Sequence, residues 1–333
     1  MKLINKISKA LAVITVALLS FSCENDSENV IEKYPTIVEI LEKDPANFSI
    51  LKAALIKTDL FNTFRNPGSY TVLAPRNSSF EAIGVTEASI ATMSTADVAL
   101  LRRRLQYHVL SIGTISADFP TNGYVNSFSP FGTSTSISLS LHTNKASGIV
   151  LNGGLSNGGA TVLQKDINAS NGVIHVIDAV LSLPKVHNLI IANPDLSSLV
   201  GVLSSTPQTS VFMDLTSTAT GATNALSRTV FAPTNAAFTN AAFLTGQSDA
   251  NITKVLRYHI ENNNRRASSS TSFASTATTI NTQLTGPQQT ITIPAATVKV
   301  VDITTVNATI RTVNIQGTNG VAHIIDKVLQ PTL

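Results

Sequence analysis

The chain has few aromatic residues and few charges. Among its 333 residues there is no tryptophan, aromatic residues make up only 5%, and charged residues make up 13%. So few rings weaken the case for a carbohydrate-binding platform built on aromatic stacking. The sequence also lacks a phosphate-binding Gly-Lys-Ser/Thr loop and a glycine-rich dinucleotide fingerprint. We therefore expect no nucleotide cofactor.

Cysteine is almost absent, because Cys23 is the only one in the chain. No internal disulfide can form, so each folded unit must be held together by its hydrophobic core. A zinc site is not expected either, since there is no set of thiolates and no closely spaced histidine pair. The sequence therefore predicts neither a metal nor any other cofactor.

An excess of charge of one sign is also missing. Three of the 23 basic residues and none of the 20 acidic residues lie in the first 22 positions, so the rest of the chain has 20 of each. The only basic run, Arg102-Arg103-Arg104, would point in three directions on a helix and is expected on a solvated face. Nucleic acid is therefore not an expected partner.

The first 22 residues are typical of an export signal. Lys2, Lys6 and Lys9 precede a short apolar run from Ala10 to Leu19. This run is too short for a membrane-spanning helix but suits the hydrophobic region of a signal peptide. We therefore assign residues 1–22 to a signal that is removed on export.

The cysteine directly after this segment is expected to carry a lipid. Ser20-Phe21-Ser22-Cys23 resembles a bacterial lipobox, although Ser20 and Phe21 stand where leucine and a small residue are usual. This resemblance implies acylation of Cys23, which would make the membrane a partner of the protein. The alternative is a secretory signal followed by an incidental cysteine.

Residues 23–35 follow as an acidic, flexible tether. Glu24, Asp26 and Glu28 lie in a stretch that is too polar to pack into a core. The stretch resembles the acidic export tag of Bacteroidota surface lipoproteins, which implies an outer-membrane, surface-exposed location. A plain polar linker is the other interpretation.

The rest of the chain is a tandem duplication. Two sequence boxes and a Tyr-His pair each occur twice in the same order: YTVLAPRNSSF (70–80) and RTVFAPTNAAF (228–238), Tyr107-His108 and Tyr258-His259, and NGVIHVIDAVL (171–181) and NGVAHIIDKVL (319–329). The period is near 150 residues, which is far longer than a solenoid repeat, so each copy is expected to be a whole domain. We place the first copy at residues 36–184 and the second copy at 185–333.

These repeated boxes resemble the fasciclin (FAS1) domain family. In that family a TVFAP-type box follows the first helices, a Tyr-His pair follows the next helix, and an NGxxHxxD-type box forms the last strand. The resemblance implies that each copy is a wedge-like β-sandwich with helices packed along one side. It also implies adhesion or extracellular-ligand binding without enzymatic activity.

The residue pattern of the first copy independently predicts an α+β fold. Apolar residues at helical spacing predict two or three short helices before residue 60, and Ser94 with Asp97 resembles a capping box for a later helix. From Val109 onward, β-branched runs separated by Gly, Ser and Asn predict strands. Helices first and strands later indicate an α+β domain. In the second copy, polar stretches at 216–227 and 267–279 predict extended loops.

The repeated histidines look structural rather than catalytic. His175 and Asp178 are three residues apart on an expected strand, so their side chains face opposite sides and cannot form a dyad. The same spacing separates His323 from Asp326. We therefore interpret these four residues as a structural motif. His108 and His259 are likewise expected to be buried and hydrogen-bonded to neighbouring backbone or strands.

One sequence matches an enzyme motif, because Gly154-Leu155-Ser156-Asn157-Gly158 has the form G-x-S-x-G. A nucleophile elbow needs a strand before the serine and a helix after it. Here the residues that follow are typical of a second strand, so the pattern indicates a hairpin. We expect no catalytic residues in this chain.

Two functional classes remain open. The first is a membrane-tethered adhesion or ligand-binding protein whose partner is a cell-surface protein or an extracellular polysaccharide. The family resemblance makes Tyr107, His108, Tyr258 and His259 the candidate ligand-binding residues for this class. The second is an accessory lipoprotein inside the envelope, for example part of a carbohydrate-handling system.

Overall fold

The computed structural model describes residues 34–134, 136–217, 227–284, 290–305 and 307–333. The expected signal peptide, Cys23 and nearly all of the expected tether lie outside these residues, as does most of the polar stretch expected at 216–227. Among the helices of the described residues, none is both long and apolar enough to span a membrane.

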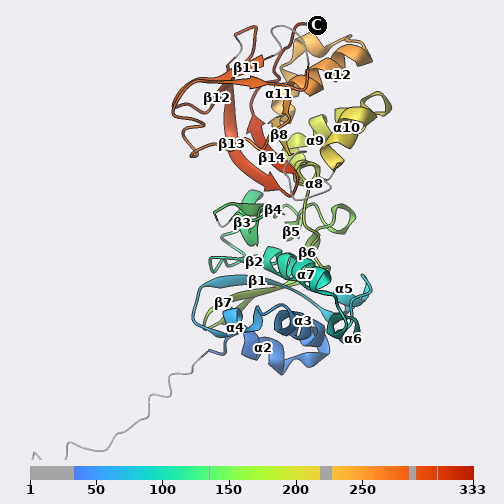
Figure 1. The fold of residues 1–333 in the computed structure, drawn as a ribbon, viewed down its shortest axis with the longest axis vertical. Helices are drawn as coiled ribbons and strands as arrows, with labels where there is room; N and C mark the ends of the chain where they lie inside the picture. The colour runs from blue at the N-terminus through green and yellow to red at the C-terminus, as the bar shows by residue number, and fades with distance from the viewer. Residues whose placement is uncertain (1–33, 135, 218–226, 285–289, 306) are drawn as a thin grey trace, which may run out of the picture. The chain divides into compact units, whose positions relative to one another are not determined.

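The first copy begins with helices and ends with strands, as the α+β pattern predicts (Figure 1). The N-cap residues Thr36 and Ser94 accept backbone hydrogen bonds at the starts of α2 and α7, and Thr36 forms a full capping box with Glu39. The elements are α2 (Ile37–Lys43), α3 (Pro45–Lys57), α4 (Phe61–Arg65), β1 (Tyr70–Pro75), α5 (Asn77–Glu81), α6 (Glu87–Ala91), α7 (Thr95–Tyr107), β2 (Val109–Leu110), β3 (Asn122–Pro130), β4 (Ser138–Asn144), β5 (Val150–Leu151), the 3₁₀ turn η1 (Leu155–Asn157), β6 (Ala160–Ala169) and β7 (Gly172–Ile177).

The second copy repeats this order with local changes, the main one being a 3₁₀ turn in place of helix α6. Its elements are α8 (Val186–Ala192), η2 (Pro194–Leu196), α9 (Ser197–Leu203), η3 (Thr206–Gln208), α10 (Thr209–Thr216), β8 (Arg228–Pro233), α11 (Asn235–Thr239), η4 (Ala242–Leu244), α12 (Asp249–Tyr258), β9 (Ile260–Glu261), β10 (Thr278–Asn281), β11 (Thr290–Ile293), β12 (Lys299–Val301), β13 (Asn307–Gly317) and β14 (Gly320–Ile325).

In each copy the described residues form one seven-stranded mixed sheet. The strand order is β2-β1-β7-β6-β5-β4-β3 in the first copy and β9-β8-β14-β13-β12-β11-β10 in the second. The two motif strands, β1 and β7 or β8 and β14, run parallel to each other. The sheet folds back on itself: β2 contacts β3, and Glu261 of β9 forms a bridge with Thr282, next to β10. The predicted α+β fold is therefore confirmed in both copies, each with helices and a mixed sheet that folds back on itself.

The motif strands are buried on both faces, which gives each domain two core layers. In β1, Val72 packs with the helices, whereas the next residue, Leu73, faces the inside of the folded sheet. In β8, Val230 and Phe231 repeat this alternation. Strands covered on both faces read as nearly continuous apolar runs, which explains the composition of the repeated boxes.

The Asn-Gly pair that opens each last-strand box has a structural reason. Gly172 and Gly320 lie so close to the neighbouring parallel strand that an added Cβ would be 2.0 Å from the Tyr70 carbonyl oxygen or 2.2 Å from that of Arg228. Their φ angles, +154° and +157°, also favour glycine. The preceding Asn171 accepts from the Ile37 amide (2.9 Å) and donates to two carbonyls just after and within α4. The box therefore fastens the helical layer to the sheet.

The asparagine of the first box has an equivalent role. Asn77 accepts from the backbone amide of Ile50 (3.0 Å), and Asn235 accepts from that of Ser198 (2.8 Å). Each amide nitrogen donates back to the first turn of the same helix, α3 or the η2–α9 segment. Both copies therefore use this side chain to hold an opening helix against the end of the motif strand.

Some local predictions need correction. Strand β7 ends at Ile177, before the end of the repeated box at Leu181; Asp178 still donates its amide to the Thr161 carbonyl (3.1 Å), but its side chain accepts the Thr161 amide. Strand β3 was not singled out in the sequence. The stretch 267–279 is irregular as far as residue 277, but Phe273 is only 3% exposed and lies in the core. This loop is thus anchored at its centre by an aromatic side chain.

Candidate functional site

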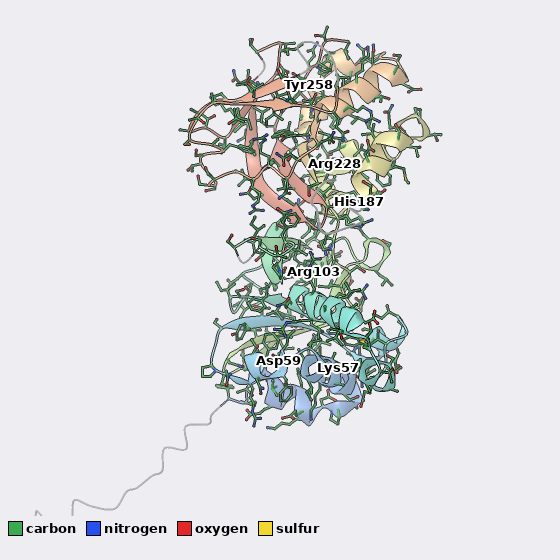
Figure 2. All side chains as sticks on the ribbon, in the orientation of Figure 1. Lys57, Asp59, Arg103, His187, Arg228 and Tyr258 are labelled. Carbon is green, nitrogen blue, oxygen red and sulfur yellow. The ribbon has the colours of Figure 1, made fainter. Side chains whose placement is uncertain are left out.

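The two candidate tyrosines end helices α7 and α12, and their side chains are fully buried (Figure 2 labels Tyr258). The Tyr107 hydroxyl donates to the Ser140 carbonyl of β4 (2.7 Å) and accepts from Asn152 Nδ2 (2.8 Å). The Tyr258 hydroxyl donates to the Thr290 carbonyl of β11 (2.8 Å). Burial raises the pKa of Tyr107, and that of Tyr258 to about 12, so both hydroxyls stay protonated. Each tyrosine thus links a helix to the sheet from within.

The neighbouring histidines make the same two bonds in both copies. His108 Nδ1 donates to the Arg104 carbonyl (2.8 Å), and its Nε2 accepts from the Leu181 amide (2.9 Å). His259 Nδ1 donates to the Val255 carbonyl (2.7 Å), and its Nε2 accepts from the amide of Leu329 (2.9 Å). Burial lowers the pKa of each imidazole to about 4, so both are neutral at neutral pH. They connect the end of the long helix to the segment after the last strand.

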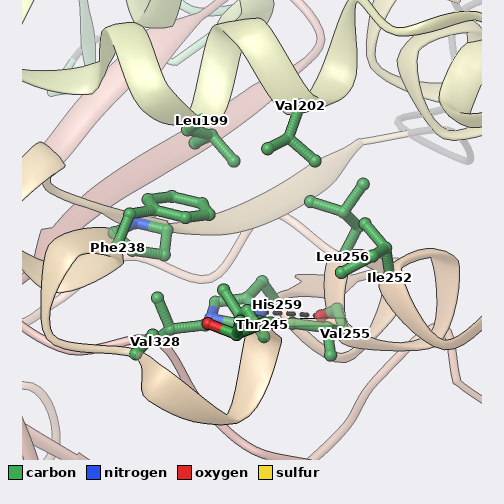
Figure 3. Close-up of a pocket in the computed structure, with 12 residues that line it drawn as sticks. Leu199, Val202, Phe238, Thr245, Ile252, Val255, Leu256, His259 and Val328 are labelled. Carbon is green, nitrogen blue, oxygen red and sulfur yellow. Dashed lines mark hydrogen bonds between the residues drawn. The ribbon is translucent and has the colours of Figure 1, made fainter. Parts of the chain in front are cut away.

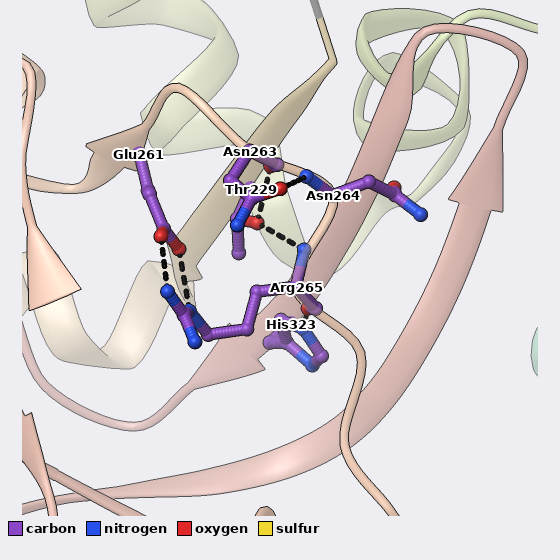
Figure 4. Close-up of polar contacts among 6 residues, drawn as sticks. All are labelled: Thr229, Glu261, Asn263, Asn264, Arg265 and His323. Carbon is purple, nitrogen blue, oxygen red and sulfur yellow. Dashed lines mark hydrogen bonds and ion pairs between the residues drawn. The ribbon is translucent and has the colours of Figure 1, made fainter. Parts of the chain in front are cut away.

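The histidines of the last-strand boxes are also held by backbone on both sides. His175 Nε2 donates to the Thr114 carbonyl (2.9 Å), and its Nδ1 accepts from the Asp166 amide (3.2 Å). His323 repeats this arrangement with the Arg265 carbonyl (2.9 Å), as Figure 4 shows. Burial lowers the pKa of both, to about 4 for His323. In both histidines the two ring nitrogens are bonded to backbone groups, so no ring nitrogen is left to act as a general base.

The aspartates that follow these histidines bond elsewhere. Asp178 Oδ1 accepts from the Thr161 amide (2.7 Å), and Asp326 Oδ1 accepts from the Thr309 amide (2.7 Å). Asp326 also pairs with Arg311 (2.8 Å). Among the described residues, neither carboxylate bonds to a histidine. The geometry therefore contains no His-Asp dyad in either box.

The G-x-S-x-G sequence does not form a nucleophile elbow. Ser156 is exposed on the 3₁₀ turn η1, and the strands on either side, β5 and β6, pair antiparallel. A serine nucleophile of this type needs a helix directly after it. In the part of the chain that the structure describes, no cluster of three or more His, Cys, Asp or Glu side chains could hold a metal ion.

A buried ion pair distinguishes the second copy from the first (Figure 4). Glu261, 6% exposed, accepts from Arg265 Nε (2.8 Å) and Nη2 (2.5 Å), and this bonding raises the pKa of the guanidinium. Pairing of Thr71 and Thr229 with the next strand puts Leu110 at the position of Glu261. The histidine contacts put Thr114 at the position of Arg265. A leucine and a threonine in the first copy therefore stand where the second copy has a charged pair.

The second copy also contains an apolar pocket of about 330 Å³. It lies between α9, α11 and α12 (Figure 3). In this view Leu199 and Val202 face His259, Thr245 and Val328 across the pocket. Its lining consists of Leu199, Val202, Pro233, Phe238, Ala241, Leu244, Thr245, Ile252, Val255, Leu256, His259 and Val328. Of the candidate ligand-binding residues, only His259 reaches this pocket.

The pocket lies where the first copy carries helix α6. In the first copy, α6 packs on α3, Lys57 at the end of α3 (Figure 2) donates to the Ala91 carbonyl (2.9 Å), and Ile90 is only 2% exposed. The box phenylalanine, Phe80, is then fully buried, whereas its counterpart Phe238 is partly exposed. A region that α6 covers in the first copy is therefore an open apolar hollow in the second.

Sequence reasoning overlooked the pocket, although one signal was available. The helix-capping serine lies 14 residues after the box phenylalanine in the first copy, at Ser94, and 10 residues after it in the second, at Ser248. A four-residue deletion at this point predicts a missing turn of helix. The side chains around the gap could not be recognised without the fold.

The sequence also shows which family the chain belongs to. The model of the fasciclin domain matches residues 46–184 and 207–331, which is most of the chain and covers both copies. The chain therefore belongs to the fasciclin domain family, in two tandem copies. Proteins of this family are commonly adhesive or ligand-binding and non-enzymatic.

Several proteins are similar to parts of the chain. An uncharacterized protein of Synechocystis sp., sll1735, is 32% identical over 149 residues, which is 44% of this chain and 97% of that protein. Protein sll1483 of the same organism is 33% identical over 180 residues, 53% of this chain and 91% of that protein. The transforming growth factor-beta-induced protein ig-h3 of Sus scrofa is 30% identical over 150 residues, 45% of this chain and 19% of that protein.

A solved structure is also similar. It is a FAS1 domain pair from the insect cell adhesion molecule Fasciclin I, with a TM-score of 0.44 and 17% identity. The match covers 88% of this chain and 96% of that one.

Proposed function

We propose that this chain is a membrane-tethered, non-enzymatic protein that binds a cell-surface protein or an extracellular polysaccharide through its two fasciclin domains. A lipid on Cys23 would hold the protein in the outer membrane, with both domains exposed at the cell surface. Family membership supports the binding role, because fasciclin domains are commonly adhesive.

The observation that carries the proposal is that the motif side chains form hydrogen bonds inside their own domains. The hydroxyls of Tyr107 and Tyr258 and the ring nitrogens of His108 and His259 are bonded within their own domains. Catalysis by general acid or base requires a group that can reach a substrate proton. The repeated polar residues instead stabilise two binding scaffolds. Binding is then expected on surfaces that differ between the copies.

Two copies on one tether also suit adhesion. If both domains engage the same surface, the second contact forms at a high effective concentration, and avidity exceeds the affinity of either domain. In this proposal the tyrosine and histidine pairs contribute by fixing the shape of each domain.

Protease treatment of intact cells tests the location. The expected result is digestion of the domains on wild-type cells, detected with an antibody, and release of the Cys23→Ala variant from the membrane fraction. Protection of the domains until the cells are lysed would overturn the surface role and favour an accessory lipoprotein inside the envelope.

Cell aggregation then tests the binding role. Cells that display the wild-type chain should aggregate or attach to polysaccharide-coated beads more than cells that lack it. The Cys23→Ala strain serves as the matched control, because it makes the same domains without the proposed anchor. Equal attachment by all three strains would contradict an adhesive function.

A further inference from the structure

The size of the second-copy pocket suits a small ligand. Its volume of about 330 Å³ lies at the lower end of the range for small-molecule sites. An apolar cavity of about 150 Å³ is large enough for one benzene molecule. In proportion, this pocket has room for about a dozen carbon atoms.

The wall of the pocket selects against charged and highly polar ligands. No lining residue carries a charge at neutral pH, and most are aliphatic. Thr245 and His259 are the only polar side chains in the lining. His259 uses both ring nitrogens on backbone groups, and burial lowers its pKa to about 4. A carboxylate, a phosphate or the hydroxyls of a sugar would therefore lose their water inside without gaining a partner.

The pocket opens to solvent on one side. Thr245 is exposed at its rim, while Phe238, Leu244 and Ile252 are partly exposed. Deeper in the pocket, Leu199, Val255 and Leu256 are buried. A ligand with an apolar part inside and a polar end in water beside Thr245 matches this gradient.

We propose that this pocket binds the hydrocarbon part of a small amphiphile, a chain of about ten to twelve carbon atoms, with its head group in water. The site is a property of the second copy alone. In the first copy the corresponding phenylalanine, Phe80, is fully buried, and Ile90 of α6 belongs to the same core cluster. The inference goes beyond the adhesive role and does not depend on it.

Calorimetric titration of the purified chain with sodium decanoate, below the concentration at which decanoate forms micelles, tests the proposal. The expected result is saturable binding of one decanoate per chain, with a negative heat-capacity change from apolar burial. The alcohol 1-decanol should compete with decanoate for the same site, because the two share the chain and differ in the head group.

Substitutions in the pocket locate the site. Val202→Phe on α9 places a ring in the pocket and should weaken decanoate binding at least tenfold. Met213→Phe is the matched control, since Met213 is 58% exposed on α10 and is not among the lining residues; it should bind like the wild-type chain. If Val202→Phe melts at a much lower temperature, Ile252→Phe at the partly exposed rim provides the same test.

Three results would overturn the inference. The first is absence of saturable decanoate binding. The second is binding that persists unchanged in both Val202→Phe and Ile252→Phe. The third is a stoichiometry of two per chain, because the first copy would then hold a site that its α6 helix should fill. Loss of cell attachment has no bearing on any of these outcomes, so failure here is distinguishable from failure of the adhesive proposal.

Discussion

The two copies share the hydrogen bonds of their repeated tyrosines and histidines but differ in an apolar pocket and in a charged pair. Tyr107 and Tyr258 bond to equivalent strands, and His108 and His259 make the same pair of backbone bonds. The residues that the duplication repeats are thus those that build the domain. The apolar pocket, in contrast, occurs where the second copy is four residues shorter. This comparison indicates that the repeated motif builds the scaffold and that the copies differ in the surface around it.

Acidification should have the largest effect, and it should act on both copies. The pKa of His108, His259 and His323 is about 4 in the folded chain, below the ordinary value near 6.5. As the pH falls from 6.5 towards 4, the unfolded chain takes up protons that the folded chain does not, so stability falls. At pH 5 each of these three histidines should lower the free energy of unfolding by about 2 kcal/mol. Urea unfolding at pH 7.5 and pH 5, at one ionic strength, measures the loss.

The control for this prediction is the pH range above 7. Here the histidines are neutral in both states, so the stability should change little between pH 7.5 and 8.5. A flat stability profile down to pH 5 would show that the histidines titrate normally and are not buried as described. Hydrogen exchange resolved by peptide would show whether both copies lose protection at low pH, as expected because each contains the same buried histidines.

Removal of the buried tyrosines should come next in size. Tyr107→Ala or Tyr258→Ala deletes a fully buried ring and leaves its carbonyl partner unpaired. Each substitution should therefore lower the free energy of unfolding by about 3–5 kcal/mol. The conservative variants Tyr107→Phe and Tyr258→Phe keep the ring and should cost about 1–2 kcal/mol. Urea unfolding of the full chain provides the measurement. If Tyr258→Ala instead abolished cell attachment with unchanged stability, the tyrosine would be a binding residue and not part of the scaffold.

The ion pair of Glu261 and Arg265 allows a direct exchange between copies. Glu261→Leu alone leaves a partly buried guanidinium without its partner and should cost about 2–3 kcal/mol. The double variant Glu261→Leu, Arg265→Thr installs the residues of the first copy, Leu110 and Thr114, and should be within about 1 kcal/mol of the wild-type chain. Urea unfolding of the single and double variants tests this. Equal destabilisation by both would mean that the charged pair is required by its surroundings.

Much of the fold could be predicted from the sequence, because the duplication supplies its own evidence. The helix cap at Ser94, the strands after Val109 and the spacing of His175 from Asp178 all follow from local patterns. The pairing of a parallel strand from residue 70 with one from residue 172 does not. It depends on contacts 100 residues apart that no local pattern specifies.

The candidate site was harder to predict for the same physical reason. Repetition of Tyr-His in both copies is compatible with either binding or structure, and the sequence cannot show which hydrogen bonds these side chains make. The pocket was visible only as a shorter spacing before Ser248. Whether a deletion leaves an open hollow or a collapsed surface depends on how Leu199, Phe238 and Ile252 pack around it.

A segment exchange tests this last point and should have the smallest effect on stability. Residues 239–247 of the second copy would be replaced by residues 81–93 of the first, which adds four residues and the α6 helix. Burial of a residue such as Ile90 favours the chimera, and the ordering of four more residues opposes it. The two contributions nearly cancel on average, since the net stability of a folded domain is only about 0.05–0.15 kcal/mol per residue. The net change in unfolding free energy should therefore be small, whereas decanoate binding should be lost. A chimera that folds and still binds decanoate would show that the missing helix is not what opens the site.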